Sequence, residues 1–221
     1  MSDYIKLFNN EQDQANFMNS ADYKSPHVSC TTNGGNLKYV TVINLEPVDV
    51  GIPGFYIANI NLGATSPMDL GSTFAWGEIA PKETYTWDNY KWGTADNLTK
   101  YNSTDNKTEL DREDDAATVI LGEHWRLPTY DEFRNYIMSS SYNTTVQRNG
   151  AIPTDSDYLP YMKLINNTTG AYVIIPKSDY YLTSTLYSKG LTRYRNMNSR
   201  AITNTQDRYR SSYIRPIYTI K

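Results

Sequence analysis

The residues best suited to recognise a ligand lie near the C-terminus, between residues 187 and 213. This segment is rich in tyrosine, arginine and asparagine and contains few aliphatic side chains. Tyrosine and arginine stack, form bidentate hydrogen bonds and dominate the binding energy of many interfaces. A subunit contact or a solvated loop would have a similar composition. The candidate ligand-binding residues of this segment are Tyr187, Arg193, Tyr194, Arg195, Asn196, Asn198, Arg200, Arg208, Tyr209 and Arg210.

Two of the four tryptophans extend this candidate surface. Trp87 and Trp92 lie in the polar stretch 84–93 together with Tyr85 and Tyr90, which makes them better candidates than the other two for an exposed aromatic patch that binds a ligand. The other two, Trp76 and Trp125, are expected in the core.

The chain offers little for catalysis or metal binding. It has one cysteine and two histidines, and it lacks the Gly-x-Ser-x-Gly, P-loop and His-Glu-x-x-His patterns. The acidic run 111–115 could hold a hard cation through its carboxylates. We favour a structural role, in which the acids precede and cap a helix that begins near Ala116. We therefore expect no enzyme activity, no cofactor and no metal.

Charge is distributed unevenly along the chain. Residues 189–221 carry eight basic residues and one acidic residue, although the whole chain has a net charge of −3. Such a segment could bind a polyanion, or it could neutralise acidic residues of its own body or of a neighbouring subunit. The overall acidity argues against nucleic acid as a partner.

The sequence contains no segment suited to a membrane. Its longest apolar runs, such as residues 171–175, are far shorter than the roughly 20 residues of a spanning helix. The first residues show no basic region followed by an apolar run. We therefore expect either a protein that is made and used without export through a cleaved signal, or one whose signal has been removed from this sequence.

Two regions that differ in their pattern of expected strands, helices and loops are distinguished along the chain. In residues 1–44 we expect a strand at 4–8, one or two helical turns at 10–20, and a hairpin whose strands flank Asn33-Gly34-Gly35. A unit of this size needs a partner surface, so it is a plausible attachment module. Residues 45–221 form the main domain.

One helix and several strands are expected in the main domain. Thr129 and Glu132 form a capping box, and Phe133, Tyr136 and Ile137 follow as an apolar stripe directed at the core. The sequence 166–170 predicts a hairpin turn. The expected strands are residues 158–165, 171–175, 180–186 and 212–220. This pattern indicates an α+β fold.

Several blocks in this order resemble the Fibrobacter succinogenes major paralogous domain over about residues 46–220. The blocks are VDVGIP (48–53), IANINLGA (57–64), DLGSTFAWGE (69–78), DDAA (114–117), WRLPT (125–129), EF (132–133), YYLTS (180–184) and IRPI (214–217). The resemblance implies a C-type-lectin-like fold, shared with formylglycine-generating enzymes and the variable proteins of diversity-generating retroelements. In the latter, the late region equivalent to residues 187–213 carries the ligand-contacting positions.

Departures from the relatives' patterns bear on activity. The formylglycine-generating enzymes need a reactive cysteine pair, whereas Cys30 is alone and outside the domain. The stretches Glu46-Pro47-Val48 and Trp87-Asp88-Asn89 do not reproduce the ligand set of calcium-dependent lectins. The resemblance therefore implies recognition without calcium and without turnover.

The first 40 or so residues are similar to the start of structural proteins from phages of gut Bacteroidales. This similarity implies a phage virion fibre or decoration protein, assembled in the host cytoplasm and forming a homo-oligomer, with trimers usual in fibres. Residues 1–44 would bind other virion proteins, and the lectin-like domain would bind a glycan or protein of the host surface. The alternative is a bacterial cell-surface lectin-like binding protein.

Overall fold

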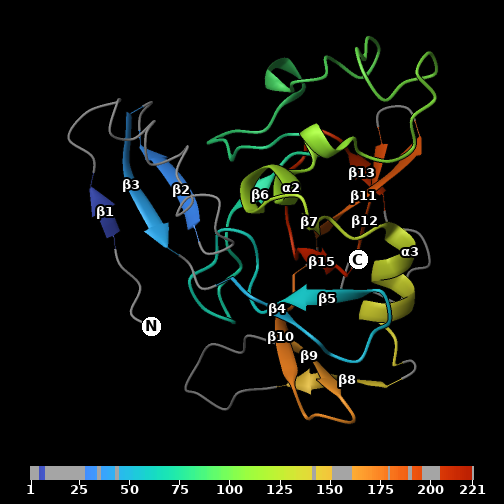
Figure 1. Ribbon diagram of the computed structural model, residues 1–221. Helices are drawn as coiled ribbons and strands as arrows, with labels where there is room; N and C mark the ends of the chain where they lie inside the picture. Colours follow the sequence, from blue (N-terminus) through green and yellow to red (C-terminus); the bar gives the residue numbers. More distant parts are fainter. Residues whose placement is uncertain are drawn as a thin grey trace.

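Strands dominate the regular structure of the chain, with a few short helices between them (Figure 1). The computed structural model describes residues 5–7, 28–33, 36–42, 45–140, 143–150, 161–178, 180–188, 191–195 and 205–220. Side chains are described for residues 45–140, 143–147, 161–178, 180–187 and 205–220. This mixed, strand-rich architecture is compatible with the α+β class that the sequence predicts.

The N-terminal region contains a small antiparallel sheet. Strand β2 (Val28–Asn33) pairs with β3 (Asn36–Val42), and β3 also pairs with β1 (Ile5–Leu7). The predicted hairpin and the predicted first strand are therefore confirmed. The helical turns expected at residues 10–20 lie outside the described residues.

A four-stranded sheet joins the two ends of the main domain. Its order is β4 (Pro47–Val48), β5 (Phe55–Ala58), β15 (Ile217–Thr219) and β7 (Trp125–Arg126). All its pairings are antiparallel, and Ile57 lies opposite Ile217 with both side chains fully buried. The first strands of the domain are thus held against its last strand (Figure 1).

A five-stranded sheet lies above it and contains much of the candidate segment. The order is β13 (Thr205–Asp207), β12 (Leu191–Arg195), β11 (Tyr181–Ser188), β14 (Ser212–Tyr213) and β6 (Thr73–Phe74). Strand β11 was predicted, but β12 and β13 were not. The strand expected over residues 212–220 is in fact two strands, β14 and β15, which belong to different sheets. Pro216, which lacks an N–H donor, lies at the break.

The third sheet of the main domain is an antiparallel meander of β8 (Thr144–Gly150), β9 (Tyr161–Asn166) and β10 (Tyr172–Pro176). The predicted hairpin turn is confirmed between β9 and β10. The side chain of Asn166 accepts a hydrogen bond from the backbone N–H of Thr168 at 2.9 Å, and Gly170 takes the positive φ of 75° that the turn requires.

The predicted helix begins as expected. In α3 (Tyr130–Glu132), Thr129 accepts from the Glu132 N–H at 3.1 Å, and the Glu132 carboxylate accepts from the Thr129 N–H at 2.8 Å. The helix continues as a π-helical turn, η3 (Phe133–Ile137), which buries Phe133 and Ile137 completely. The capping box and the core stripe are therefore confirmed.

The described residues contain three further short helices: η1 (Trp87–Asn89), η2 (Arg112–Asp114) and α2 (Ala116–Leu121). Asp115 caps α2, since its side chain accepts from the Thr118 N–H at 3.0 Å. The acidic run therefore precedes a helix, as the sequence predicts. Among the described residues, no helix has the length and apolarity needed to cross a bilayer.

Among the described side chains, two large clusters of apolar residues form the core. One surrounds Trp76 and Trp125, which are 0% and 2% exposed and confirm the prediction for these tryptophans. The other gathers Phe133, Ile57 and their neighbours beneath α3. Beside this second cluster lies an unexpected residue, the fully buried Arg215.

Arg215 connects separate parts of the fold through its guanidinium. It donates 2.8 Å hydrogen bonds to the carbonyl oxygens of Ala58 and Ile174, which belong to different sheets. Burial lowers the pKa of Arg215 to about 10. Its charge is compensated by backbone dipoles, because no carboxylate among the described residues pairs with it.

We expect Arg215→Ala to lower the free energy of unfolding by about 3 kcal/mol, because two buried carbonyls lose charged donors. Arg215→Lys should lower the free energy of unfolding by less, because an ammonium keeps the positive charge. It should still be destabilising, because an ammonium does not reproduce the guanidinium fork, the two N–H groups that bond the two carbonyls. Urea unfolding followed by tryptophan fluorescence measures both. The exposed Arg210→Ala is the control, and an Arg215→Ala variant as stable as this control would show that the fork is not structural.

Candidate functional site

A second buried arginine connects the C-terminal segment to the long loop that follows β6. Arg208 is 0% exposed and donates to the carbonyl of Lys100 at 3.1 Å and to the carbonyl of Tyr101. Its guanidinium lies 5.2 Å from the ring of Trp76. The prediction that Arg208 contacts a ligand is therefore wrong. The two terminal nitrogens of the guanidinium bond carbonyls and an aromatic face covers it, whereas its Nε is buried without a hydrogen-bond partner among the described residues.

Tyr101 holds the other end of this connection. It is fully buried, its φ is 57°, and its ring packs edge-on against Trp76 at 4.9 Å. Its hydroxyl donates to Asp114 at 2.7 Å and accepts from the Asp111 N–H at 2.9 Å. A left-handed backbone at a non-glycine residue costs roughly 1 kcal/mol, which these contacts offset.

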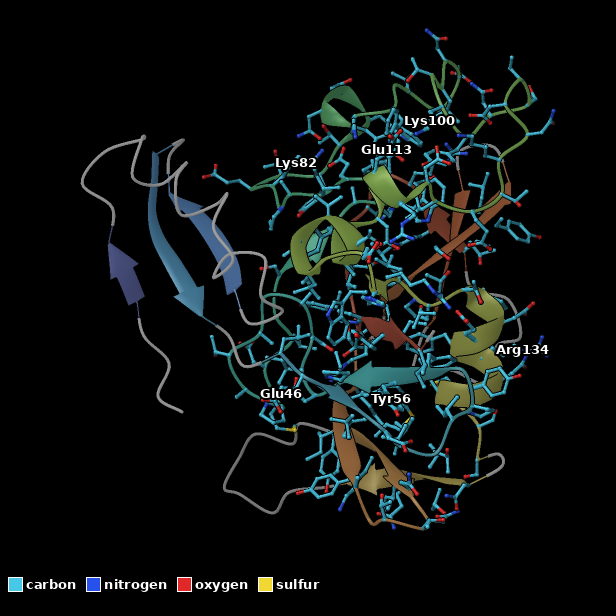
Figure 2. All side chains as sticks on the ribbon, viewed as in Figure 1. Glu46, Tyr56, Lys82, Lys100, Glu113 and Arg134 are labelled. Carbon is cyan, nitrogen blue, oxygen red and sulfur yellow. The ribbon has the colours of Figure 1, made fainter. Side chains whose placement is uncertain are left out.

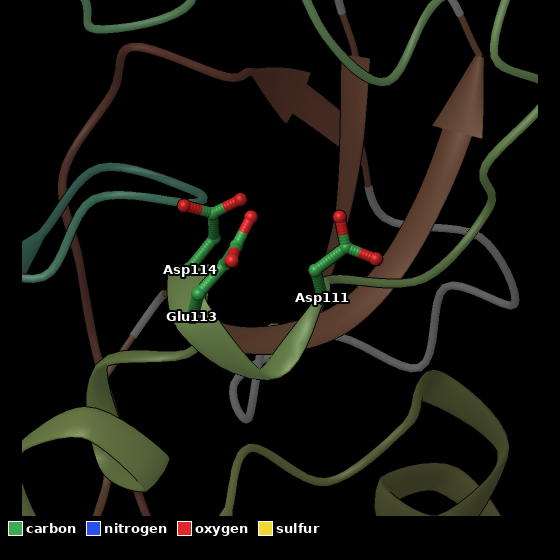
Figure 3. A group of neighbouring side chains, drawn as sticks. All are labelled: Asp111, Glu113 and Asp114. Atoms are coloured by element: carbon green, nitrogen blue, oxygen red, sulfur yellow. The ribbon is translucent and has the colours of Figure 1, made fainter.

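The acidic cluster binds a lysine of the same chain. Asp111, Glu113 and Asp114 gather on one side of η2 (Figure 3). The ammonium of Lys100 lies among them, 2.7 Å from Asp111, 2.9 Å from Glu113 and 2.6 Å from Asp114. Figure 2 shows Lys100 beside Glu113. All three carboxylates therefore pair with a cation of the chain itself.

Lys100 shifts the titration of its partners. Although burial alone would raise the pKa of Asp114, hydrogen bonds from Lys100, Tyr101 and Lys91 hold that pKa below its ordinary value. Hydrogen bonds from Lys100 and Lys107 lower the pKa of Asp111. Conversely, these carboxylates raise the pKa of Lys100 against the effect of its burial.

We expect Lys100→Met to lower the free energy of unfolding at neutral pH by about 3 kcal/mol, because Asp114 is left buried with fewer cations. The carboxylates have lowered pKa values in the folded state, so the network stabilises above the ordinary pKa of 3.8 and this contribution is lost as the pH falls through the folded values. The difference from wild type should therefore shrink toward about pH 3.

Urea unfolding as a function of pH measures this effect. Lys107→Met is the matched control, because Lys107 is 43% exposed and bonds Asp111 at the surface, and it should cost less than about 1 kcal/mol. If Lys100→Met lowers the free energy of unfolding by the same amount at every pH, the lysine stabilises the protein by packing alone.

A groove opens beside the connection made by Arg208. Its volume is about 640 Å³, within the range of small-ligand sites. It lies where the edge strand β13 and the segment that follows it meet the loop containing η1. Figure 1 shows β13 in the upper part of the molecule. The residues that line the groove are Tyr85, Tyr180, Thr205, Gln206, Asp207, Tyr209, Arg210 and Ser211.

Two of the groove's tyrosine rings are fixed by neighbours. The ring of Tyr209 lies 5.0 Å from that of Trp87, which in turn packs edge-on against Tyr90 at 5.6 Å. The hydroxyl of Tyr85 donates to the Thr73 carbonyl at 2.5 Å and accepts from the Lys82 N–H at 3.0 Å. The groove therefore presents aromatic faces whose orientation is set before a ligand arrives.

The polar side chains of the groove are also positioned. Asp207 accepts from Arg210 Nε at 3.2 Å, and the largely buried Gln206 donates to the Ser212 hydroxyl at 2.6 Å. These side chains and the hydroxyls of Thr205 and Ser211 offer hydrogen-bond donors and acceptors beside the aromatic faces. Such a surface can bind a polar molecule that also has an apolar face.

The groove gathers part of the predicted set. Tyr209 and Arg210 line it, and Trp87 supports Tyr209 from behind. Tyr187 is 47% exposed in β11. Arg193, Tyr194 and Arg195 belong to β12, where Arg193 pairs with Thr205 of β13, but their side chains lie outside the described residues. Asn196, Asn198 and Arg200 lie outside the described residues altogether.

Trp92 does not lie in the groove, contrary to the expectation of an exposed patch. Its indole N–H donates to the Gly77 carbonyl at 3.0 Å, and its ring is covered by Lys91 and Lys100 at 4.3 and 5.1 Å. Partly buried, it packs against the core cluster around Trp76 and stabilises the loop. Tyr90, unlike the partly buried Trp92, is buried, and its hydroxyl donates to the Trp76 carbonyl at 2.7 Å.

Several groove residues were missing from the predicted set. Tyr180 precedes a strand, Asp207 is the one acid in a basic segment, and Tyr85 is close to Trp87 in sequence. That closeness was a usable signal for Tyr85. Tyr180 and Asp207 carry no comparable signal, because pairing between distant segments places them here.

A second cavity of about 420 Å³ lies between α2 and β7, and charged side chains that line it already have partners in the fold. The Glu123 carbonyl accepts from Arg112. The carboxylate of Glu109 accepts from the Ser184 and Thr185 hydroxyls.

Arg126 of the same cavity makes two hydrogen bonds to Glu132, at 2.6 and 2.7 Å, and burial raises the pKa of the capping residue Asp115 to about 6. The ring of His124 stacks on that of Tyr218, with the ring centroids 5.2 Å apart.

No family model, curated protein or solved structure matches this chain.

Proposed function

We propose that this protein is a non-enzymatic recognition protein with a C-type-lectin-like domain, part of a phage virion as a fibre or decoration protein. The domain binds a glycan or protein on the surface of the host. Residues 1–44 attach it to other virion proteins, and the protein forms a homotrimer. The sequence resemblance over residues 46–220 and the similarity of the first residues to phage structural proteins motivate this proposal.

The observation that carries the proposal is the groove beside β13. The resemblance implies that ligand contacts come from the late strand region, and β13 with the segment after it forms one wall of the groove. Its aromatic faces and positioned polar groups suit the recognition of a surface molecule.

The strand arrangement supports a binding role further. Pairing of β5 with β15 fixes both ends of the domain in one sheet, so the long segment between them can form irregular loops on a rigid base. Recognition residues on such loops are positioned by the scaffold instead of by regular structure of their own.

Binding of labelled protein to a panel of Bacteroidales cells tests this function. We expect Tyr209→Ala to reduce binding to a susceptible strain by at least about ten-fold, because Tyr209 is a central aromatic face of the groove. Asp207→Asn should also weaken binding, and it removes only a surface charge. Tyr172→Ala is the matched control, since Tyr172 is 53% exposed on β10, away from the groove.

Equal binding by wild type, Tyr209→Ala and Asp207→Asn would contradict the assignment of the groove. Absence of binding by wild type to every strain would contradict the proposed function. Circular dichroism of each variant separates lost binding from lost folding.

A further inference from the structure

We infer that the groove binds an uncharged saccharide, and that it does so without a metal ion. This inference rests on the proposed function and specifies the class of its ligand. It departs from the cationic surface that the sequence suggests for this segment.

The charges of the groove cancel. Among its described lining residues, Asp207 and Arg210 are the charged side chains, and they pair with each other at 3.2 Å. Arg208 and Arg215 contribute no surface charge here, because both are fully buried. A polyanion would therefore meet no unpaired cation among these residues, whereas a neutral ligand incurs no unfavourable charge.

The aromatic faces fit the apolar side of a sugar ring. A pyranose presents several C–H groups on one face, and these carry partial positive charge toward the negative face of an aromatic ring. Tyr85, Tyr180 and Tyr209 all line the groove, and Tyr209 is backed by Trp87. Rings held in advance lose little conformational entropy on binding, so stacking contributes more to affinity.

The polar groups fit the hydroxyl edge of the same ring. Neighbouring sugar hydroxyls donate and accept at once, which suits a carboxylate next to a guanidinium. Asp207 and Arg210 form such a pair, and Thr205 and Ser211 add hydroxyls within the groove. A flat protein epitope would make less use of a concave site of this kind.

The donor set does not suit calcium. Ca²⁺ takes six to eight oxygen ligands, usually with several carboxylates among them. Asp207 is the one carboxylate among the described residues that line the groove, and Arg210 is bonded to it. Saccharide binding at this site should therefore depend on side chains alone.

A panel of immobilised oligosaccharides tests the inference. One set contains neutral hexoses and N-acetylhexosamines, and the other contains uronic acids. We expect wild type to bind a member of the neutral set, with affinity unchanged by EDTA and altered less than about two-fold between about 50 and 500 mM NaCl. Tyr209→Ala should weaken this binding by at least about ten-fold, and Tyr172→Ala should leave it unchanged.

The outcomes distinguish the inference from the function on which it rests. Binding that is restricted to the acidic oligosaccharides and lost at high salt overturns the uncharged ligand class. Binding that EDTA abolishes overturns the metal-free mode. In both cases the proposed recognition function still holds. A third outcome is that wild type binds no saccharide but binds cells through Tyr209, and that protease treatment of the cells destroys this binding. That result identifies a protein ligand and also overturns the inference. Failure of wild type to bind either cells or saccharides overturns the proposed function as well.

Discussion

The enclosed guanidinium of Arg208 is the interaction on which the candidate site depends. Removing such a group from water costs several kcal/mol unless its donors find acceptors. Here the carbonyls of Lys100 and Tyr101 accept from it and Trp76 covers its face, and burial lowers the pKa of Arg208 below its ordinary value. The arginine can be buried only if the loop around residue 100 packs against the C-terminal segment.

That packing brings together segments that are far apart in sequence. Because Arg208 points into the domain, the chain on either side of it leaves Asp207 and Tyr209 at the groove. On the loop side, Tyr101 and Lys100 hold the acidic turn η2, while Trp87 meets Tyr209. Two cations thus stabilise the loop. Arg208 does so by donating to backbone carbonyls, and Lys100 does so by pairing with carboxylates. The groove lies on the surface formed by these packed segments.

Local signals in the sequence predicted local structure well. The capping box at Thr129 and the turn ending at Gly170 depend on neighbouring residues, and both were confirmed. The inward direction of Arg208 and Arg215 could not be predicted, since arginine is almost always exposed unless it is paired, and its partners here are backbone carbonyls contributed by distant segments. Strand β13 was missed because Thr-Gln-Asp has little apolar pattern and owes its extended form to pairing with β12.

The central claim is that Arg208 holds the loop against the C-terminal segment and thereby forms the groove. Hydrogen–deuterium exchange of the Arg208→Lys protein tests it most directly, because lysine keeps the charge but cannot bridge both carbonyls. The account predicts faster exchange in residues 84–101 and 205–211, with the sheet of β8, β9 and β10 unchanged. Exchange identical to wild type in both segments would contradict it.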